Sequence, residues 1–128
     1  MSLNTGDVLL FADPITITVN AVGQVLNRTS MGANSGAFRK DDGSHSLSIA
    51  HTLGKNNQRV IRFDRTQTVS DPFTTGEYLT ATDSVWLVSR SPQGLLTVVQ
   101  QKQLVDGFLT YLQASSGAAV TKLLSGES

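Results

Sequence analysis

The chain has 128 residues, no cysteine, and ten basic residues against ten acidic ones, so it carries no formal net charge at pH 7. The lack of cysteine excludes a disulfide scaffold, a thiolate metal site and a cysteine nucleophile. With 39% hydrophobic and 16% charged residues, the composition is that of a globular chain, and its length predicts one domain over residues 1–128.

The N-terminal segment does not have the pattern of a secretory signal. Residues 1–14, MSLNTGDVLLFADP, contain no basic residue before a very short apolar run, whereas a signal peptide begins with a basic region. No stretch of the sequence approaches the roughly 20 apolar residues that a membrane-spanning helix needs. We therefore expect the protein to fold in a cytoplasm.

The first half of the sequence predicts β-strands separated by turns. It is rich in Thr, Val, Ile and Ser and is punctuated by Gly, Asn and Asp, which is typical of strands and their turns. Two strands, Asp7–Ala12 and Ile15–Val22, are expected to form an N-terminal hairpin around the turn-forming pair Asp13-Pro14. A short strand is expected near Gly36–Lys40.

Residues 44–69 predict two alternating strands joined by the polar turn GKNN at 54–57. Apolar and hydroxyl side chains alternate in the first strand, while Ile61 and Phe63 alternate with Arg62 and Asp64 in the second. The basic residues of this stretch gather in its second half, against Asp64 as the single acid there: Lys55, Arg59, Arg62 and Arg65. A sheet face with hydroxyl and guanidinium groups favours RNA as a partner. The alternative is a solvated strand whose arginines serve only solubility.

The second half of the sequence predicts a loop, a strand and two helices. Residues 70–82 have little periodicity and indicate an exposed loop, and the largely apolar Ser84–Arg90 indicates a strand covered on both faces. A long helix over 92–114 and a short one over 118–124 are expected to flank a break at Ser115-Ser116-Gly117. Strands followed by helices indicate an α+β fold with an antiparallel sheet of about five strands.

The long helix carries an apolar stripe that one chain would leave partly uncovered. Its start is expected at Ser91-Pro92, a pair typical of a helix N-terminus. An open sheet edge and an apolar stripe are liabilities unless they are interfaces, so a homodimer is expected. Gly107 inside the helix costs about 1 kcal/mol relative to Ala, which close approach of a partner backbone would explain. The expected dimer interface comprises Leu95, Val98, Val105, Gly107, Phe108 and Leu112.

The sequence gives no positive sign of catalysis, of a metal site or of a cofactor site. His45 and His51 share the parity of one predicted strand, but no third ligand stands at a recognisable spacing. Asp41-Asp42 lies beside Arg39-Lys40 and is best explained as a charged turn. The motifs G-x-S-x-G, H-E-x-x-H and the P-loop are absent. Trp86 is the only tryptophan, and it is either a core residue, the more usual role, or a platform on which a base stacks.

The order of these elements resembles that of the coat proteins of single-stranded RNA bacteriophages, the levivirus group. The run GKNNQRVIRFDR at 54–65 resembles the turn and strand in which this family has a polar tip. The run DPFTTGEYLTATDSVWLVSRSP at 71–92, followed by a long helix, resembles its loop, last strand and helix entry. The resemblance covers residues 7–124 and consists of a pattern rather than of many identical residues.

The resemblance implies a fold, a function and partners. The fold is an N-terminal β-hairpin, an antiparallel sheet and two C-terminal α-helices that clasp a partner subunit in an intertwined homodimer. The function is that of a structural capsid protein, not an enzyme and without a cofactor. The dimers assemble in the bacterial host cytoplasm into an icosahedral virion shell that packages single-stranded genomic RNA. In some members the inner face also binds an RNA stem-loop and represses translation. The alternative left open is a small dimeric β-rich RNA-binding regulatory protein that forms no shell.

The resemblance also assigns faces and loops. Leu47, Ile49, Ile61 and Phe63 would face helices, and the opposite parity would face RNA. The implied RNA-binding residues are Ser46, Ser48, Thr52, Lys55, Arg59, Val60, Arg62 and Trp86. Ala50 and Val60 depart from the hydroxyl and basic side chains that the family carries at such positions. The implied inter-dimer loop comprises Asp71, Pro72, Phe73, Thr74, Thr75, Gly76 and Glu77. That loop holds no cysteine, so covalent cross-linking of a shell is not expected.

Overall fold

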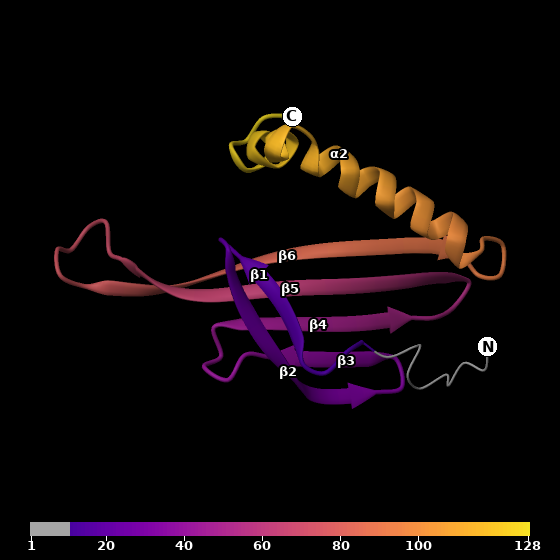
Figure 1. The fold of residues 1–128 in the computed structure, drawn as a ribbon, viewed down its shortest axis with the longest axis horizontal. Coiled ribbons are helices and arrows are strands. Elements are labelled where there is room, and N and C mark those ends of the chain that lie inside the picture. The colour runs from indigo at the N-terminus through magenta and orange to yellow at the C-terminus, as the bar shows by residue number, and fades with distance from the viewer. Residues whose placement is uncertain (1–10) are drawn as a thin grey trace. The chain divides into compact units, whose positions relative to one another are not determined.

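A computed structural model of the chain describes residues 11–128 and contains a six-stranded sheet and one C-terminal helix (Figure 1). The strands follow one another in the sheet in the order β1-β2-β3-β4-β5-β6, so each strand lies beside its neighbours in sequence. The strands are β1 Ile15–Val19, β2 Val22–Gly32, β3 Ser35–Arg39, β4 His45–Thr52, β5 Asn56–Ser70 and β6 Tyr78–Pro92.

The described residues divide into two compact units. One unit holds the residues up to Thr52 together with Arg59–Val88, and the other holds Leu53–Gln58 together with Ser89–Ser128. The first unit therefore contains most of the sheet, and the second contains the turn between β4 and β5 and the helix. No described helix is both long enough and apolar enough to span a membrane.

The N-terminal hairpin is present, but its strands are not those expected from the sequence. β1 ends at Val19, and the chain turns at Asn20 and Ala21, whose φ angles are 51° and 64°. Two consecutive residues with positive φ form the two-residue turn whose twist matches antiparallel strands. The prediction of one strand over Ile15–Val22 was therefore wrong. The predicted strand Asp7–Ala12 lies mostly outside the described residues, and its last two residues are not in a strand.

β2 is a long strand that the sequence analysis missed. Its first half pairs with β1, and its second half pairs with β3. The register shifts between Arg28 and Ser30, and such a bulge bends a strand and increases its twist. Figure 1 shows the hairpin of β1 and β2 lying across the neighbouring strands of the same unit. The bend therefore lets the hairpin fold back over one face of the sheet.

The core of this unit lies under that hairpin. Its fully or nearly buried apolar residues come from three strands, and half-buried side chains of β1 and β5 pack against them. The buried residues are Leu26, Phe38, Leu47 and Ile49, and the packed ones are Ile15, Ile17, Ile61 and Phe63. The prediction that Leu47, Ile49, Ile61 and Phe63 share one face is confirmed. The other members of this cluster come from the hairpin and from β3, and the predicted contact with helices stays a prediction.

The strands after the hairpin agree in kind with the sequence prediction, and β5 and β6 are longer. β3 corresponds to the strand expected near Gly36–Lys40. β5 continues to Ser70 and β6 begins at Tyr78, so the loop that was expected over 70–82 is only 71–77. The Asp71 amide donates to the Glu77 carbonyl at 2.9 Å, which closes the base of this short loop. β6 then runs to Pro92 and was underestimated as Ser84–Arg90.

The helix α2, Val98–Leu124, begins six residues later than predicted. Ser91 and Pro92 are the last residues of β6. The cap is Thr97, whose hydroxyl accepts from the Gln100 amide at 3.2 Å, while the Gln100 side chain accepts from the Thr97 amide at 2.9 Å. This reciprocal capping box satisfies two amides that a helix start leaves without partners. The T-x-x-Q pattern in the sequence is the signal that the prediction overlooked.

The expected interruption of the helix is confirmed. Ala114 is extended in ψ, and Ser115, Ser116 and Gly117 all have positive φ, of 53°, 58° and 79°. Three consecutive left-handed residues cannot continue a right-handed helix, so α2 has a break at the residues that the sequence indicated. No residue of α2 is buried. The intertwining of such helices with a partner stays a prediction.

We predict that replacing Leu26 with Ala lowers the free energy of unfolding by about 2–5 kcal/mol, because the side chain is completely buried and leaves a cavity. The control is Val25→Ala on the same strand, where the side chain is 45% exposed and the loss should be about 0.5 kcal/mol or less. Urea unfolding followed by circular dichroism measures both. Equal losses for the two variants would contradict the placement of the core beneath the hairpin.

Candidate nucleic-acid interface

The sheet of the first unit has a second face, opposite the apolar cluster. Side chains alternate between the faces of a strand, so Ser46 and Ser48 point away from the core residues Leu47 and Ile49. In the register, Ser46 stands opposite Arg39 and Ser48 stands opposite Ala37. We call this surface the polar face. Its central residues are Ser46, Ser48, Ala50 and Thr52 of β4, Val60, Arg62 and Asp64 of β5, and Ser84 and Trp86 of β6.

Asp64 is the centre of the hydrogen bonds on the polar face. Its Oδ1 accepts from Arg62 Nε at 2.7 Å and also from the Ser84 hydroxyl. Its Oδ2 accepts from the Ser46 hydroxyl at 3.5 Å. Arg62 Nη2 donates to Ser84 Oγ at 3.3 Å. One carboxylate thus connects side chains of β4, β5 and β6, and it fixes the guanidinium of Arg62 in place.

Trp86 lies on the same face and is covered by Arg62. The guanidinium carbon of Arg62 is 4.6 Å from the centre of the Trp86 ring, within the range of a cation–π contact. Trp86 remains 54% exposed, and the Arg62 side chain is 41% exposed. Trp86 is therefore not a core residue of the single chain. Together the indole and the guanidinium form a partly exposed planar surface.

Several forces act on the pKa of Asp64. Burial raises the pKa, but hydrogen bonds from Ser84 and Arg62 and the positive charge of Arg62 outweigh it, and the net pKa is lowered from 3.8. The carboxyl group is therefore ionised at neutral pH. The ion pair with Arg62 is accordingly the state of this site under ordinary conditions, and the two charges compensate each other.

Two of the other predicted cations, Arg59 and Arg65, lie on the face of the sheet opposite Arg62. Arg59 Nη1 donates to His51 Nδ1 at 3.0 Å, and His51 alternates in step with the core residue Ile49, so Arg59 lies on the opposite face. Arg65 forms a two-pronged ion pair with Asp83, with distances of 3.1 and 2.8 Å. Lys55 is exposed in the turn that belongs to the second unit. Adjacent positions in the sequence suggested one basic patch, and strand alternation divides it.

The two histidines have structural contacts. His45 is buried, and its ring stacks on Phe63 with centroids 5.8 Å apart. Its Nδ1 is 2.7 Å from the Ser44 hydroxyl. Over residues 11–128, no group of three or more His, Asp or Glu side chains is arranged to hold a metal ion.

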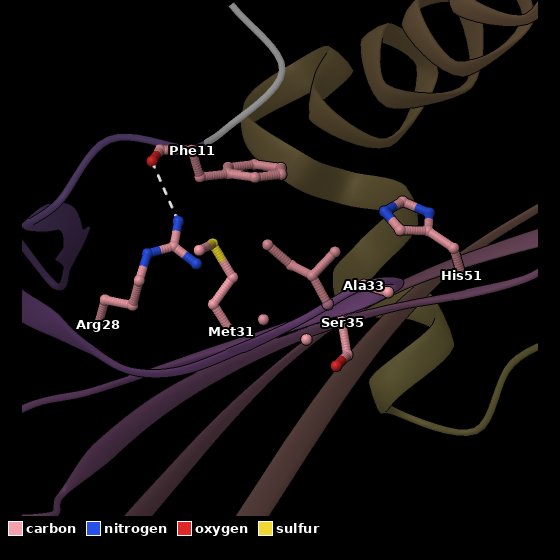
Figure 2. Close-up of a pocket in the computed structure, with 9 residues that line it drawn as sticks. Phe11, Arg28, Met31, Ala33, Ser35 and His51 are labelled. Atoms are coloured by element: carbon pink, nitrogen blue, oxygen red, sulfur yellow. Dashed lines mark hydrogen bonds between the residues drawn. The ribbon is translucent and has the colours of Figure 1, made fainter. Parts of the chain in front are cut away.

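A pocket that the sequence did not indicate opens beside the bent strand β2 (Figure 2). Its volume is about 200 Å³, and its lining residues are Phe11, Arg28, Met31, Gly32, Ala33, Ser35, Gly36, Ile49 and His51. The cationic group at one side is engaged, because Arg28 Nη2 donates to the Phe11 carbonyl at 3.2 Å and the guanidinium lies over Phe38. His51 is bonded to Arg59. The two cationic or ionisable side chains of the pocket, Arg28 and His51, are thus already bonded to other groups of the chain.

The residues expected at a dimer interface are largely exposed in the single chain. Leu95, Val98 and Phe108 have exposed fractions of 75%, 79% and 55%, while Val105 and Leu112 are half-buried. A Cβ added to Gly107 would meet no atom within 4 Å. In the expected inter-dimer loop, Phe73 is 94% exposed. The helix and the loop thus each expose large apolar side chains.

No protein-family model and no curated protein matches the sequence. Solved structures do match. The chain in the virus-like particle of bacteriophage ESE058 is 11% identical, with a TM-score of 0.68 over 90% of this chain and 97% of that one. The chain in the virus-like particle of bacteriophage AVE019 is 13% identical, with a TM-score of 0.67 over 88% of this chain and 95% of that one. The bacteriophage EMS014 coat protein is 13% identical, with a TM-score of 0.59 over 85% of this chain and 80% of that one. At such low identity the similarity establishes a shared fold.

Proposed function

We propose that this chain is the coat protein of a single-stranded RNA bacteriophage, a single structural domain that dimerises and assembles into an icosahedral shell around genomic RNA. The observation that carries the proposal is the fold: a six-stranded up-and-down sheet followed by one interrupted helix. Its match extends over 95% and 97% of the chains in two virus-like particles. A fold alone does not imply a function, so the surfaces of this chain must support the proposal as well.

The first supporting surface is the helix. All of α2 lacks buried residues, although Val98, Leu104 and Phe108 are large apolar side chains with exposed fractions of 79%, 78% and 55%. Burying an apolar side chain of this size is worth about 1.5–3 kcal/mol relative to leaving it exposed. A second copy of the chain that covers this helix would gain that free energy, as an intertwined homodimer does.

The second supporting surface is the edge of the sheet. β6 is the last strand in the order and has 15 residues, and no described strand lies beyond it. Val85 and Val88 on this strand are 70% and 52% exposed. A long edge strand with exposed apolar residues invites pairing with another strand. In the proposed dimer, the sheets of two subunits join at such edges.

The third supporting surface is the polar face. Ser48 and Thr52 on this face carry hydroxyl groups, and Arg62 with Trp86 forms a planar stacking surface. These groups suit the backbone and the bases of single-stranded RNA. The RNA would line the inside of the shell. Recognition of one stem-loop, with translational repression, is a finer function that this face would serve. The loop at 71–77, with Phe73 exposed, would form contacts between dimers.

Size and RNA content test the proposal directly. The purified protein is expected to run as a particle of megadalton mass in size-exclusion chromatography with light scattering, and to carry RNA that resists added nuclease. A species near twice the chain mass of 13.7 kDa that binds RNA would instead support a small RNA-binding regulatory protein. A monomer without RNA would refute both functions.

Gly107→Leu tests the dimer. A Cβ added at Gly107 would meet no atom within 4 Å in the single chain, and Leu is a better helix former than Gly. The variant should therefore keep the circular dichroism spectrum of the native protein. We predict that it fails to dimerise, because the added side chain blocks close approach of a partner backbone.

The matched control for this test is Gln103→Leu, one helical turn earlier, where the native side chain is already long and exposed. This control should dimerise normally in analytical ultracentrifugation. Normal dimerisation of Gly107→Leu would show that no partner backbone approaches this glycine.

A further inference from the structure

The contacts of Arg62 raise the question of what its charge can do on the polar face. An arginine that binds phosphate is expected to have no carboxylate partner, but Arg62 Nε is 2.7 Å from Asp64 Oδ1. Its Nη2 is bonded to Ser84, and the guanidinium carbon lies over the Trp86 ring, 4.6 Å from its centre. The arginine is held in one orientation by three contacts from β5 and β6.

Asp64 is the member of this group that holds the others together. It accepts hydrogen bonds from Ser46, Arg62 and Ser84. Its side chain is only 20% exposed, so solvent screens the pair less than it would screen an ion pair at the surface. A phosphate that approaches Arg62 must therefore compete with a carboxylate that is already in place.

An unpaired base meets no such competition. The outer surface of the guanidinium and the exposed part of Trp86 are both planar, and bases stack on aromatic rings and on guanidinium planes. Stacking of one base on an aromatic side chain is worth about 1–3 kcal/mol. Stacking leaves the ion pair between Arg62 and Asp64 intact, whereas a direct phosphate contact would break it.

We propose that Asp64 determines the specificity of the polar face, because it neutralises Arg62 and holds the guanidinium over Trp86, so that the face selects the unpaired bases of single-stranded RNA over the phosphates of duplex RNA. This inference rests on the proposed function, in which this face meets RNA. Asp64 is a positioning residue in this scheme and acts through Arg62. Arg39 stands opposite Ser46 at the end of β3, and it would contribute general electrostatic attraction to RNA.

The test compares Asp64→Asn with Asp83→Asn. Both variants remove one carboxylate that pairs with an arginine of β5, but Asp83 and its partner Arg65 are on the other face of the sheet. The full-length proteins are titrated with a short single-stranded oligoribonucleotide and with the duplex of the same sequence, over a series of salt concentrations. The dissociation constants give the preference for single strands and the slope of log K against log salt.

Asp64→Asn should bind the duplex more tightly than the wild type does, so its preference for single strands falls severalfold. Its salt slope for single-stranded RNA should steepen by about 0.7, the increment for one added phosphate contact. Asp83→Asn should keep the wild-type preference and slope. The fluorescence of Trp86, the only tryptophan, should also change in Asp64→Asn without RNA, because the guanidinium is no longer held over the indole.

A double variant, Arg62→Gln with Asp64→Asn, covers the case in which Asp64→Asn does not fold. It removes both charges and should keep the wild-type salt slope, since the native pair is already neutral. A slope that becomes shallower by about 0.7 would mean that Arg62 contacts phosphate in the wild type, and would overturn the inference. So would an unchanged preference and slope in Asp64→Asn, or equal changes in Asp83→Asn. Failure of the wild type to bind any RNA would instead refute the proposed function.

Discussion

The alternation of side chains along β4 and β5 is the constraint on which the other features depend. Because successive residues point to opposite faces, each apolar residue of these strands is paired in sequence with one that must face away from the core. The buried position of Leu47 and Ile49 thereby fixes the outward direction of Ser46 and Ser48. A slip of one residue would exchange the two faces completely, so the burial of the apolar face also specifies the polar one.

The hairpin makes this arrangement stable within one chain. A single sheet with one apolar face needs something to cover that face, and the bulge in β2 bends the hairpin so that Leu26 and Ile17 meet it. Trp86 on the polar face and large apolar side chains of α2, such as Val98 and Leu104, are more than half exposed. In the proposed coat protein these two surfaces have separate partners: RNA meets the polar face, and a second subunit covers the helix.

The sequence predicted those features that depend on local periodicity. The two strands at 44–69, the break near Ser116 and the shared face of Leu47 and Ile61 all follow from spacing that is visible in the sequence, and the structure has them. The hairpin was misplaced because Asp13-Pro14 is the more familiar turn signal, whereas the actual turn at Asn20-Ala21 requires positive φ in an alanine. Alanine is not among the residues that are preferred in turns.

The candidate site was less predictable, for a different physical reason. Lys55, Arg59, Arg62 and Arg65 are close in sequence, and charge counting treats them as one patch, but the parity of the strand sends Arg59 and Arg62 to opposite faces. The orientation of Trp86 could not be deduced from a strand that is apolar on both sides. The partnership between Arg62 and Asp64 depends on side-chain geometry across β5 and β6, which no pattern in one sequence encodes.

The central claim is that the polar face lines the inside of a shell built from copies of this chain. Electron cryomicroscopy of the purified protein tests it most directly. We expect closed icosahedral particles in which Arg62 and Trp86 face the interior, with density for RNA against them and with α2 packed on a partner subunit. Particles that place these two residues on the outer surface, or a sample that holds only dimers, would contradict it.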